Sequence, residues 1–438
     1  MTTFLNIIIK WFKGQITQLM RGDIRVLQFK LKKLFLMFFV SCFTVMFIPL
    51  FFIIRIISSI ILIRFGRLPS RRIGHFINDV NLYLCFKKKS YFQYDLFYVE
   101  KPVCNFTLLN SFKKYLIILP EFFLLPFVIL NNIKFIGNSK HNVTFHPYAE
   151  SADLRDRNDG EKKIEYFTKK QIEKGFSFLK NFGLDKKDKF VCLLCRDPAY
   201  VNSLYNNTYD LAFNEHGDDS DFRYTDIENF RLVSEYLTNQ GYYVFRMGKN
   251  VSKPFSINNK KFIDYASLNN KSDFLDIFLS SHCEMFISTG AGLDVVGAVF
   301  DKPIVFVSNA MVAWTRSSNK KQLTIYKHFV NKKTAKNLTL SEIFKSDLAL
   351  LEHSKSFKEK NINLIENNSE DIKDAAKDML ELIKNNFELD SEKKTLQTKF
   401  WKLFKKNIDE HNCSHLHASF FKSHIGYNFL IKYKNFLE

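Results

Sequence analysis

The stretch from Met285 to Ser308 constrains the fold more than any other part of the chain. It reads MFISTGAGLDVVGAVFDKPIVFVS, an apolar run, a glycine turn, a helix-spaced run and a second apolar run. Asp301-Lys302-Pro303 ends the helix, and the β-branched residues that follow are typical of a buried parallel strand. The pattern predicts one β-α-β unit. The backbone N–H groups at its strand-to-helix turn are expected to bind an anion such as phosphate.

Further predicted strands and helices alternate on both sides of this unit. In the second half of the chain, strands are expected over 190–194 and 242–245, with helices over 224–240 and 272–281. The first half begins with a strand over 60–64, followed by a basic loop and a helix. This alternation predicts an α/β fold with two Rossmann-like domains built on parallel sheets.

Composition shifts divide the chain into five segments. The polar stretch 147–163 carries Pro, Gly and charges without apolar periodicity, as a connection between domains does. The expected segments are a basic tail with a hydrophobic membrane segment (1–58), an N-terminal α/β domain (59–146), a linker with a connecting helix (147–188), a C-terminal α/β domain (189–388) and helices that pack back toward the N-terminal domain (389–438).

The formal net charge of +19 favours an anionic partner. Membrane phospholipid, nucleotide phosphates and nucleic acid all fit that charge, but no recognised nucleic-acid-binding motif is visible. The seven Cys are scattered without regular spacing, which favours a reducing compartment over a disulfide framework. Cys192 and Cys195 form a CxxC within a strand, where they point to opposite faces, so a zinc site is not expected there.

A hydrophobic segment near the start of the chain predicts membrane attachment. Residues 34–54 form 21 consecutive positions without a charge, enough to cross a bilayer as a helix. Basic residues flank both ends, which opposes a single crossing, and Pro49 interrupts the run. We favour a kinked, re-entrant or monotopic insertion. A single span and a buried helix of a soluble domain remain alternatives.

Charged and small residues follow the predicted strands of the C-terminal half. Arg196, Arg246 and the pair Ser288/Thr289 each come directly after or at the end of a strand. The carboxyl ends of parallel strands share one edge of a sheet, so these groups are expected to form a metal-independent diphosphate site. As an alternative, Gly290 and Gly292 simply permit close helix packing, since neither a Walker loop nor a GxGxxG fingerprint is present.

The motifs in combination resemble a family of GT-B-like glycosyltransferases encoded among bacterial surface-polysaccharide (O-antigen and capsule) genes. The resemblance spans roughly residues 60–385. It rests on RRIGH (71–75), Arg196-Asp197, DFR (221–223) with DIEN (226–229), GYYVFRMG (241–248), STGAG (288–292), KPIV (302–305) and ENNS (366–369) with Ile372. The Asn-rich stretch 202–217 departs from the pattern, which is more compact there.

The resemblance implies sugar transfer from a nucleotide-sugar donor in the C-terminal domain to a lipid-linked or other glycan acceptor in the membrane-attached N-terminal domain. It implies a location at the bacterial inner membrane with the catalytic domains facing the cytoplasm, and no cofactor or metal. The general base is expected to be His75 or Asp79, and Arg196 is expected to stabilise the leaving group. The residues expected to bind the donor are Arg196, Arg223, Asp226, Arg246, Gly248, Ser288, Thr289, Gly290, Ala291, Gly292 and Asp294.

Specific roles follow for three of these residues. Asp294 would accept a ribose hydroxyl, while Arg223 and Asp226 would position the donor sugar. Two other classes of function remain open. One is a different transferase of surface-glycan assembly, which moves pyruvyl or glycerol phosphate, and the other is a non-catalytic membrane-attached assembly partner.

Overall fold

The computed structural model describes residues 24–87, 90–143, 145, 164–200, 202–203, 218–417 and 420–438. Residues 1–23, all of the polar connection 147–163 and most of the Asn-rich stretch 202–217 lie outside the described residues.

The N-terminal domain is built on a four-stranded parallel sheet in the order β3-β2-β1-β4. The strands are β1 (Leu62–Leu68), β2 (Gln93–Val99), β3 (Ile117–Ile118) and β4 (Asn142–Val143). Two helices, α4 (Ile73–Phe86) and α5 (Phe106–Phe112), cover one face of this sheet. The other face is covered by α3 (Ile48–Ile57) and α6 (Glu121–Asn132).

The C-terminal domain contains a seven-stranded sheet in the order β13-β10-β9-β8-β5-β6-β7, with every neighbouring pair parallel. Its strands are β5 (Phe190–Leu194), β6 (Tyr243–Arg246), β7 (Phe262–Ile263), β8 (Met285–Ser288), β9 (Ile304–Asn309), β10 (Gln322–Tyr326) and β13 (His424–Ile425). Two parallel α/β sheets confirm the predicted fold class. The predicted β-α-β unit is present as β8, α13 (Gly292–Val299) and β9.

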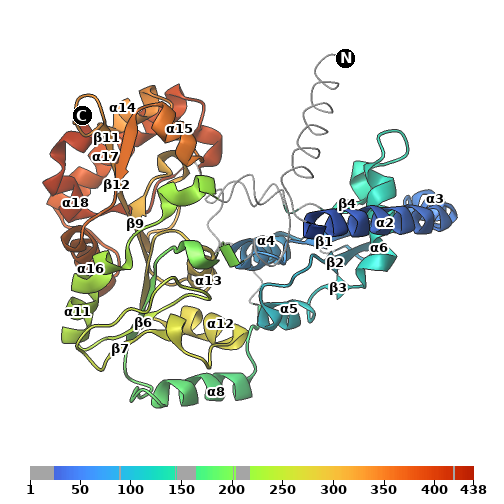
Figure 1. The fold of residues 1–438 in the computed structure, drawn as a ribbon, viewed down its shortest axis with the longest axis horizontal. Helices are drawn as coiled ribbons and strands as arrows, with labels where there is room; N and C mark the ends of the chain where they lie inside the picture. Colours follow the sequence, from blue (N-terminus) through green and yellow to red (C-terminus); the bar gives the residue numbers. More distant parts are fainter. Residues whose placement is uncertain are drawn as a thin grey trace.

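Helices cover both faces of the larger sheet (Figure 1). On one side lie α8 (Lys169–Lys180) and α12 (Asp273–His282), and on the other lie α11 (Arg231–Asn239), α16 (Ser369–Lys384) and α17 (Ser391–Glu410). The smaller elements are α14 (Leu340–Lys345), α15 (Ser354–Glu359), α18 (Tyr427–Lys432) and an antiparallel pair of β11 (His328–Asn331) with β12 (Ile362–Ile365).

The C-terminal helices pack on the C-terminal domain, so the expectation that they return to the N-terminal domain is wrong. Phe400, Trp401 and Phe404 of α17 are buried in the core of the larger sheet. After α17, the chain adds β13 to the edge of that sheet beside β10. The apolar stripe of α17 is compatible with more than one apolar surface. It packs on the sheet of its own domain, which is the nearest one.

The hydrophobic segment forms two helices, α2 (Ile24–Met46) and α3, with Pro49 in the first turn of α3. Within the described residues, no single helix has the length and apolar composition of a membrane span. Phe38–Met46 and Ile48–Ile57 meet that criterion as a pair, with a bend of 50° between them.

The two domains meet through helix N-termini near the centre of the molecule, where α4 lies against α13 (Figure 1). A Cβ atom added to Gly74 of α4 would lie 3.2 Å from the Cα of Gly292. Beside this contact, the Asp273 carboxylate of α12 accepts a hydrogen bond from the backbone N–H of Phe106, the first residue of α5 (2.8 Å). The negative charge at this helix N-terminus stabilises the contact.

Candidate functional site

The glycine turn after β8 is held by its own side chains. Ser288 donates to the Asp294 carboxylate (2.6 Å) and accepts from the backbone N–H of Gly290 (3.1 Å). The same carboxylate oxygen accepts from the backbone N–H of Ala291 (2.8 Å). Gly290 has φ +77°, a left-handed conformation that glycine adopts without steric cost. Asp294 therefore fixes the shape of the turn at the start of α13.

Two roles predicted for this turn do not fit the observed hydrogen bonds. The N–H groups of Gly290 and Ala291 already donate to Ser288 and Asp294, so these two groups do not face an open phosphate site in the structure. Asp294 is 1% exposed, and burial raises the pKa of its carboxyl. This residue is a cap inside the domain, and it is not positioned to accept a ribose hydroxyl.

The exits of β5 and β8 are joined beside the turn. Leu194 and Ser288 are paired in the sheet, and the backbone N–H of Arg196 donates to Thr289 Oγ1 (2.8 Å). Arg223, at the end of a 3₁₀ turn (Asp218–Arg223), donates from Nη2 to the carbonyl of Gly290 (2.7 Å). The structure therefore brings together Arg196, Arg223, Thr289 and Gly290 from segments far apart in the sequence.

The electrostatics around Arg223 are those of a positive cluster. Burial, reinforced by the positive charge of Arg196 and less strongly by that of Arg72, lowers the pKa of Arg223 to about 10. Asp294 and Glu352 oppose this shift but do not offset it. Guanidiniums that repel one another are stabilised when an anion binds between them. The cluster therefore favours a diphosphate or a similar polyanion.

Arg72 brings the N-terminal domain into this cluster. It is the N-cap residue of α4, the helix whose Gly74 touches Gly292. The charge of Arg72 acts on Arg223, so the basic loop after β1 lies near the glycine turn. The contributions of Arg316, whose charge acts on Asp294, and of Glu352 were not foreseen. Neither residue lies in a recognisable motif.

Arg246 does not reach the cluster, which corrects the prediction made for it. Its side chain is 1% exposed and donates to the carbonyl of Lys253 (2.8 Å). It also pairs with the Asp264 carboxylate at 3.4 Å. The strand end that carries Arg246 was placed correctly, but a nearby carboxylate holds the guanidinium inside the domain.

Two further predicted donor-site residues have structural partners. Asp226 caps the 3₁₀ turn Ile227–Phe230 by accepting from the backbone N–H of Glu228 (3.1 Å), and it pairs with Lys253 at 3.2 Å. Gly248 lies in the loop after β6, where an added Cβ would contact Val251 and Ala266. These contacts do not involve the glycine turn.

The two candidate bases form a pair on α4. His75 Nδ1 lies 3.4 Å from the Asp79 carboxylate, one helical turn further along. The His75 side chain is 52% exposed, whereas that of Asp79 is 3% exposed and accepts from Asn78 Nδ2 (3.0 Å). A buried carboxylate behind an exposed imidazole orients the ring and fixes which nitrogen carries its proton. Because His75 follows Gly74, this pair lies next to the glycine turn.

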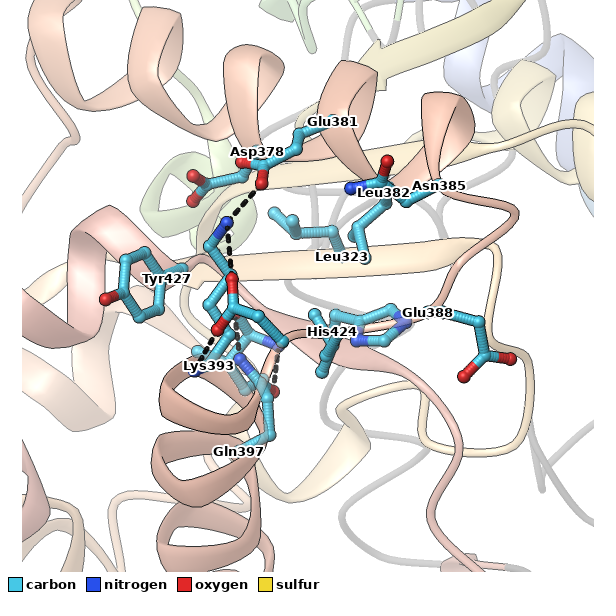
Figure 2. A pocket seen from close by; sticks show the side chains of 13 residues that line it. Leu323, Asp378, Glu381, Leu382, Asn385, Glu388, Lys393, Gln397, His424 and Tyr427 are labelled. Carbon is cyan, nitrogen blue, oxygen red and sulfur yellow. Dashed lines mark hydrogen bonds and ion pairs between the residues drawn. The ribbon is translucent and has the colours of Figure 1, made fainter.

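A separate small cavity of about 60 Å³ lies in the C-terminal domain (Figure 2). It is lined by residues of α16, α17, α18, β10 and β13 and of the loop between α16 and α17, and none of them belongs to the glycine turn. Several of its polar residues are paired: Lys393 with Glu381 and Asp390, and Gln397 with the backbone of Ile425, whereas Nε2 of His424 has no hydrogen-bond partner. Arg72, Arg196 and Arg223, which we call the guanidinium cluster, are the better candidate site.

The cysteines and other potential metal ligands are dispersed. Cys192 and Cys195 lie in the cores on opposite faces of the larger sheet, as the strand periodicity predicted. Across the described part of the chain, no three His, Cys, Asp or Glu side chains are grouped in a way that could hold a metal ion.

The chain matches no protein-family description and no curated protein. Among solved structures, it is similar to the ADP-heptose lipopolysaccharide heptosyltransferase II of E. coli, with 11% identity, a TM-score of 0.37, and coverage of 56% of this chain and 84% of that chain. It is similar to a family 9 glycosyl transferase of Veillonella parvula, with 11% identity, a TM-score of 0.40, and coverage of 72% and 97% respectively. It is also similar to TibC of enterotoxigenic E. coli, an iron-containing dodecameric glycosyltransferase, with 10% identity, a TM-score of 0.33, and coverage of 60% and 63%. Similarities at these scores carry no argument about activity.

Proposed function

We propose that this chain is a glycosyltransferase that moves a sugar from a nucleotide-sugar donor to an acceptor hydroxyl. One observation carries the proposal. Arg223 binds the Gly290 carbonyl at the glycine turn of the C-terminal domain, and the His75–Asp79 pair of the N-terminal domain begins one residue after Gly74, which approaches Gly292 of that turn. An anion site on one domain and an acid–base pair on the other are the two requirements of this reaction.

The leaving group determines the role of the arginines. When the bond between the anomeric carbon and the donor phosphate oxygen breaks, the nucleoside diphosphate keeps the electron pair and gains negative charge. Arg223, anchored on the Gly290 carbonyl, and Arg196 would stabilise that charge. Their interaction strengthens as the bond breaks, so it lowers the barrier as well as binding the donor.

The acceptor hydroxyl must lose a proton as its oxygen bonds to the anomeric carbon. His75 would take that proton on Nε2, because Nδ1 faces the Asp79 carboxylate at 3.4 Å. Asp79 then stabilises the imidazolium that forms. In this scheme His75 is the base, Asp79 positions it, and no group beyond the donor and the acceptor is needed.

The biological setting is also a proposal. A lipid-linked glycan acceptor at the bacterial inner membrane, with both catalytic domains facing the cytoplasm, would place the reaction in surface-polysaccharide synthesis. The net charge of +19 and the exposed apolar residues of the N-terminal domain support a site at an anionic membrane.

A donor screen on detergent-solubilised protein tests the reaction class. Thermal shifts would be compared for nucleotide sugars, phosphoenolpyruvate and CDP-glycerol. We expect one nucleotide sugar to raise Tm, since a ligand at a hundred times its Kd adds about 2.7 kcal/mol to stability. A shift with CDP-glycerol or phosphoenolpyruvate alone would instead indicate glycerol-phosphate or pyruvyl transfer.

Matched variants connect that binding to the site. Arg223→Gln should abolish the donor shift, while Arg231→Gln, which removes an exposed arginine of α11, should preserve it. His75→Ala should preserve donor binding and lower the transfer rate by about 10²–10⁴-fold. Full glycan assembly in cells that carry His75→Ala would identify the chain as a non-catalytic assembly partner.

A further inference from the structure

Exposed apolar side chains are concentrated in the N-terminal domain. Large hydrophobic residues that are more than a third exposed occur throughout residues 27–135. In the described part of the C-terminal half, the corresponding residues are Leu350, Ile365, Phe420 and Ile431. Soluble proteins rarely expose a continuous apolar patch of this kind unless it binds a partner.

These residues form one surface, which we call the apolar face. It lies on the side of the smaller sheet that is turned away from α4, at the end of the molecule where α2, α3 and α6 gather (Figure 1). Its members are Leu34, Phe35, Phe38 and Phe39 of α2, Leu50, Phe52, Ile53 and Ile56 of α3, Phe122 and Phe123 of α6, and Ile133 and Phe135 after α6.

Contacts between the helices make the surface continuous. The ring of Phe43 in α2 lies 6.5 Å from that of Phe122 in α6, and the rings of Phe47 and Phe127 lie 5.4 Å apart. The segment after α6 is tied to α3 because the Arg55 guanidinium donates to the carbonyl of Ile136. Helices distant in the sequence therefore expose their apolar sides together.

The inner side of α3 belongs to the core of the domain. Phe51 is 1% exposed and Ile54 is 7% exposed, and both share a cluster with Phe65 of β1 and Phe127 of α6. Phe65 and Phe127 are stacked with ring centroids 4.8 Å apart. Drawing α3 into a bilayer as part of a span would open this core, so α3 keeps its place along the domain.

We propose that the apolar face inserts into one leaflet of an anionic bilayer, with α2, α3 and α6 lying along the membrane surface. The charge of its surroundings selects a lipid partner. Lys32, Lys134 and Lys140 are exposed around the face, and the whole chain carries +19. Amphipathic helices bind in this way when apolar side chains enter the acyl region and lysines meet anionic headgroups.

This inference goes beyond the proposed reaction and holds whichever group the crevice transfers. It assigns a lipid-binding role to α6, which lies more than sixty residues after the hydrophobic segment in the chain. It also places the smaller sheet against the membrane, with α4 and the His75–Asp79 pair on the opposite side of that sheet from the lipid.

Vesicle flotation of the full chain tests the role of α6. The probe is a vesicle of phosphatidylethanolamine and phosphatidylglycerol, with pure phosphatidylcholine vesicles as the neutral comparison. We expect the double variant Phe122→Glu/Phe123→Glu to weaken binding to the anionic vesicles by at least roughly tenfold, because charges replace two aromatic rings that would enter the acyl region of the bilayer. Binding to the neutral vesicles should be weaker for every form of the protein.

Two control variants separate lipid contact from misfolding. Phe122→Leu/Phe123→Leu keeps the apolar character and should bind like the unaltered chain. Leu350→Glu/Ile365→Glu places the same two charges at similarly exposed positions of the C-terminal domain and should also have no effect. Circular dichroism and the thermal transition of the Glu variant should match those of the Leu variant.

Three results would overturn the inference. Undiminished flotation of the Glu variant would show that α2 and α3 anchor the protein without α6, as a spanning segment would. Equal binding to neutral and anionic vesicles would remove the role of the lysines. If the Glu variant instead converted a dimer into a monomer in sedimentation experiments while vesicle binding persisted, a second copy of the chain would cover this face.

Discussion

Arg223 and Arg246 lie beside the carboxyl edge of the same sheet, yet they have opposite environments. Arg246 is 1% exposed, bound to the Lys253 carbonyl and paired with Asp264. Arg223 is bound to the Gly290 carbonyl, and burial together with the positive charge of Arg196 lowers its pKa, against the opposing charges of Asp294 and Glu352. A buried arginine with its own carboxylate stabilises a fold, whereas an arginine with no carboxylate bonded to its guanidinium and another arginine close by is a candidate for binding an anion.

The largest expected effect tests the structural half of this comparison. Arg246→Ala removes the cation that pairs with Asp264, whose carboxylate keeps only its hydrogen bonds from the Phe255 N–H and the Ser267 hydroxyl, and should lower the free energy of unfolding by about 3–5 kcal/mol. Denaturant unfolding measures this change, with Arg231→Ala as the control: its half-exposed guanidinium pairs with Glu228, and its loss should cost no more than about 1 kcal/mol. If the Arg246→Ala variant had normal stability but no longer bound the donor, Arg246 would be a donor-binding residue.

The second prediction tests the functional half. Arg223→Ala should weaken binding of the nucleoside diphosphate chosen by the donor screen by about 1.5–3 kcal/mol, the worth of hydrogen bonds to a charged group. The free energy of unfolding should change by less than that, because the loss of the hydrogen bond to the Gly290 carbonyl is offset by the loss of repulsion with Arg196. Titration calorimetry and unfolding of one preparation would measure both. A large loss of stability with unchanged affinity would show that Arg223 is structural.

The glycine turn offers a smaller effect that sharpens the comparison. Gly290→Ala should cost about 1–2 kcal/mol, since φ is +77° and an added Cβ has open space, with Arg223 Nη2 at 3.8 Å. Gly292→Ala instead brings a Cβ to 3.1 Å from the backbone of Gly74. We therefore expect Gly290→Ala to lower donor affinity only slightly, and Gly292→Ala, which disturbs the contact between the domains, to lower the transfer rate more strongly. If both variants lost the same share of donor affinity and of transfer rate, the two glycines would not have separate roles.

The smallest expected effect concerns the support of Arg196. Thr289→Val removes the acceptor of the Arg196 backbone N–H, which should cost about 1 kcal/mol of stability. Donor affinity should fall only a few-fold, because the guanidinium itself remains. Thr398→Val, on the exposed side of α17, is the matched control for stability. An affinity loss as large as that of Arg223→Ala would make Thr289 a direct ligand of the donor.

Local sequence patterns located most elements of the fold. Apolar strands bounded by Pro and Gly placed β8, α13 and β9 almost to the residue, and the helix predicted over 272–281 is α12. The arrival of Arg196 and Thr289 at one edge also followed from the strand order. These features depend on residues that are close in the chain or on a rule of parallel sheets.

The predictions that were wrong share one cause: the partner of a side chain depends on which segments lie close together in the folded protein. Nothing in the sequence shows that Asp264 would capture Arg246, or that Asp294 would turn back to cap its own helix. The path of α17 onto the larger sheet was equally hidden, because its apolar stripe fits more than one surface.

Taken alone, the sequence determined the parallel α/β architecture, the position of the glycine turn and the apolar character of the first helices, because periodicity and backbone sterics act over a few residues. Only the tertiary structure decided that Arg246 pairs with Asp264 while Arg223 binds the Gly290 carbonyl. It also decided that α2, α3 and α6 share one exposed face. Charge pairing and surface exposure depend on distances between segments that the chain order does not contain.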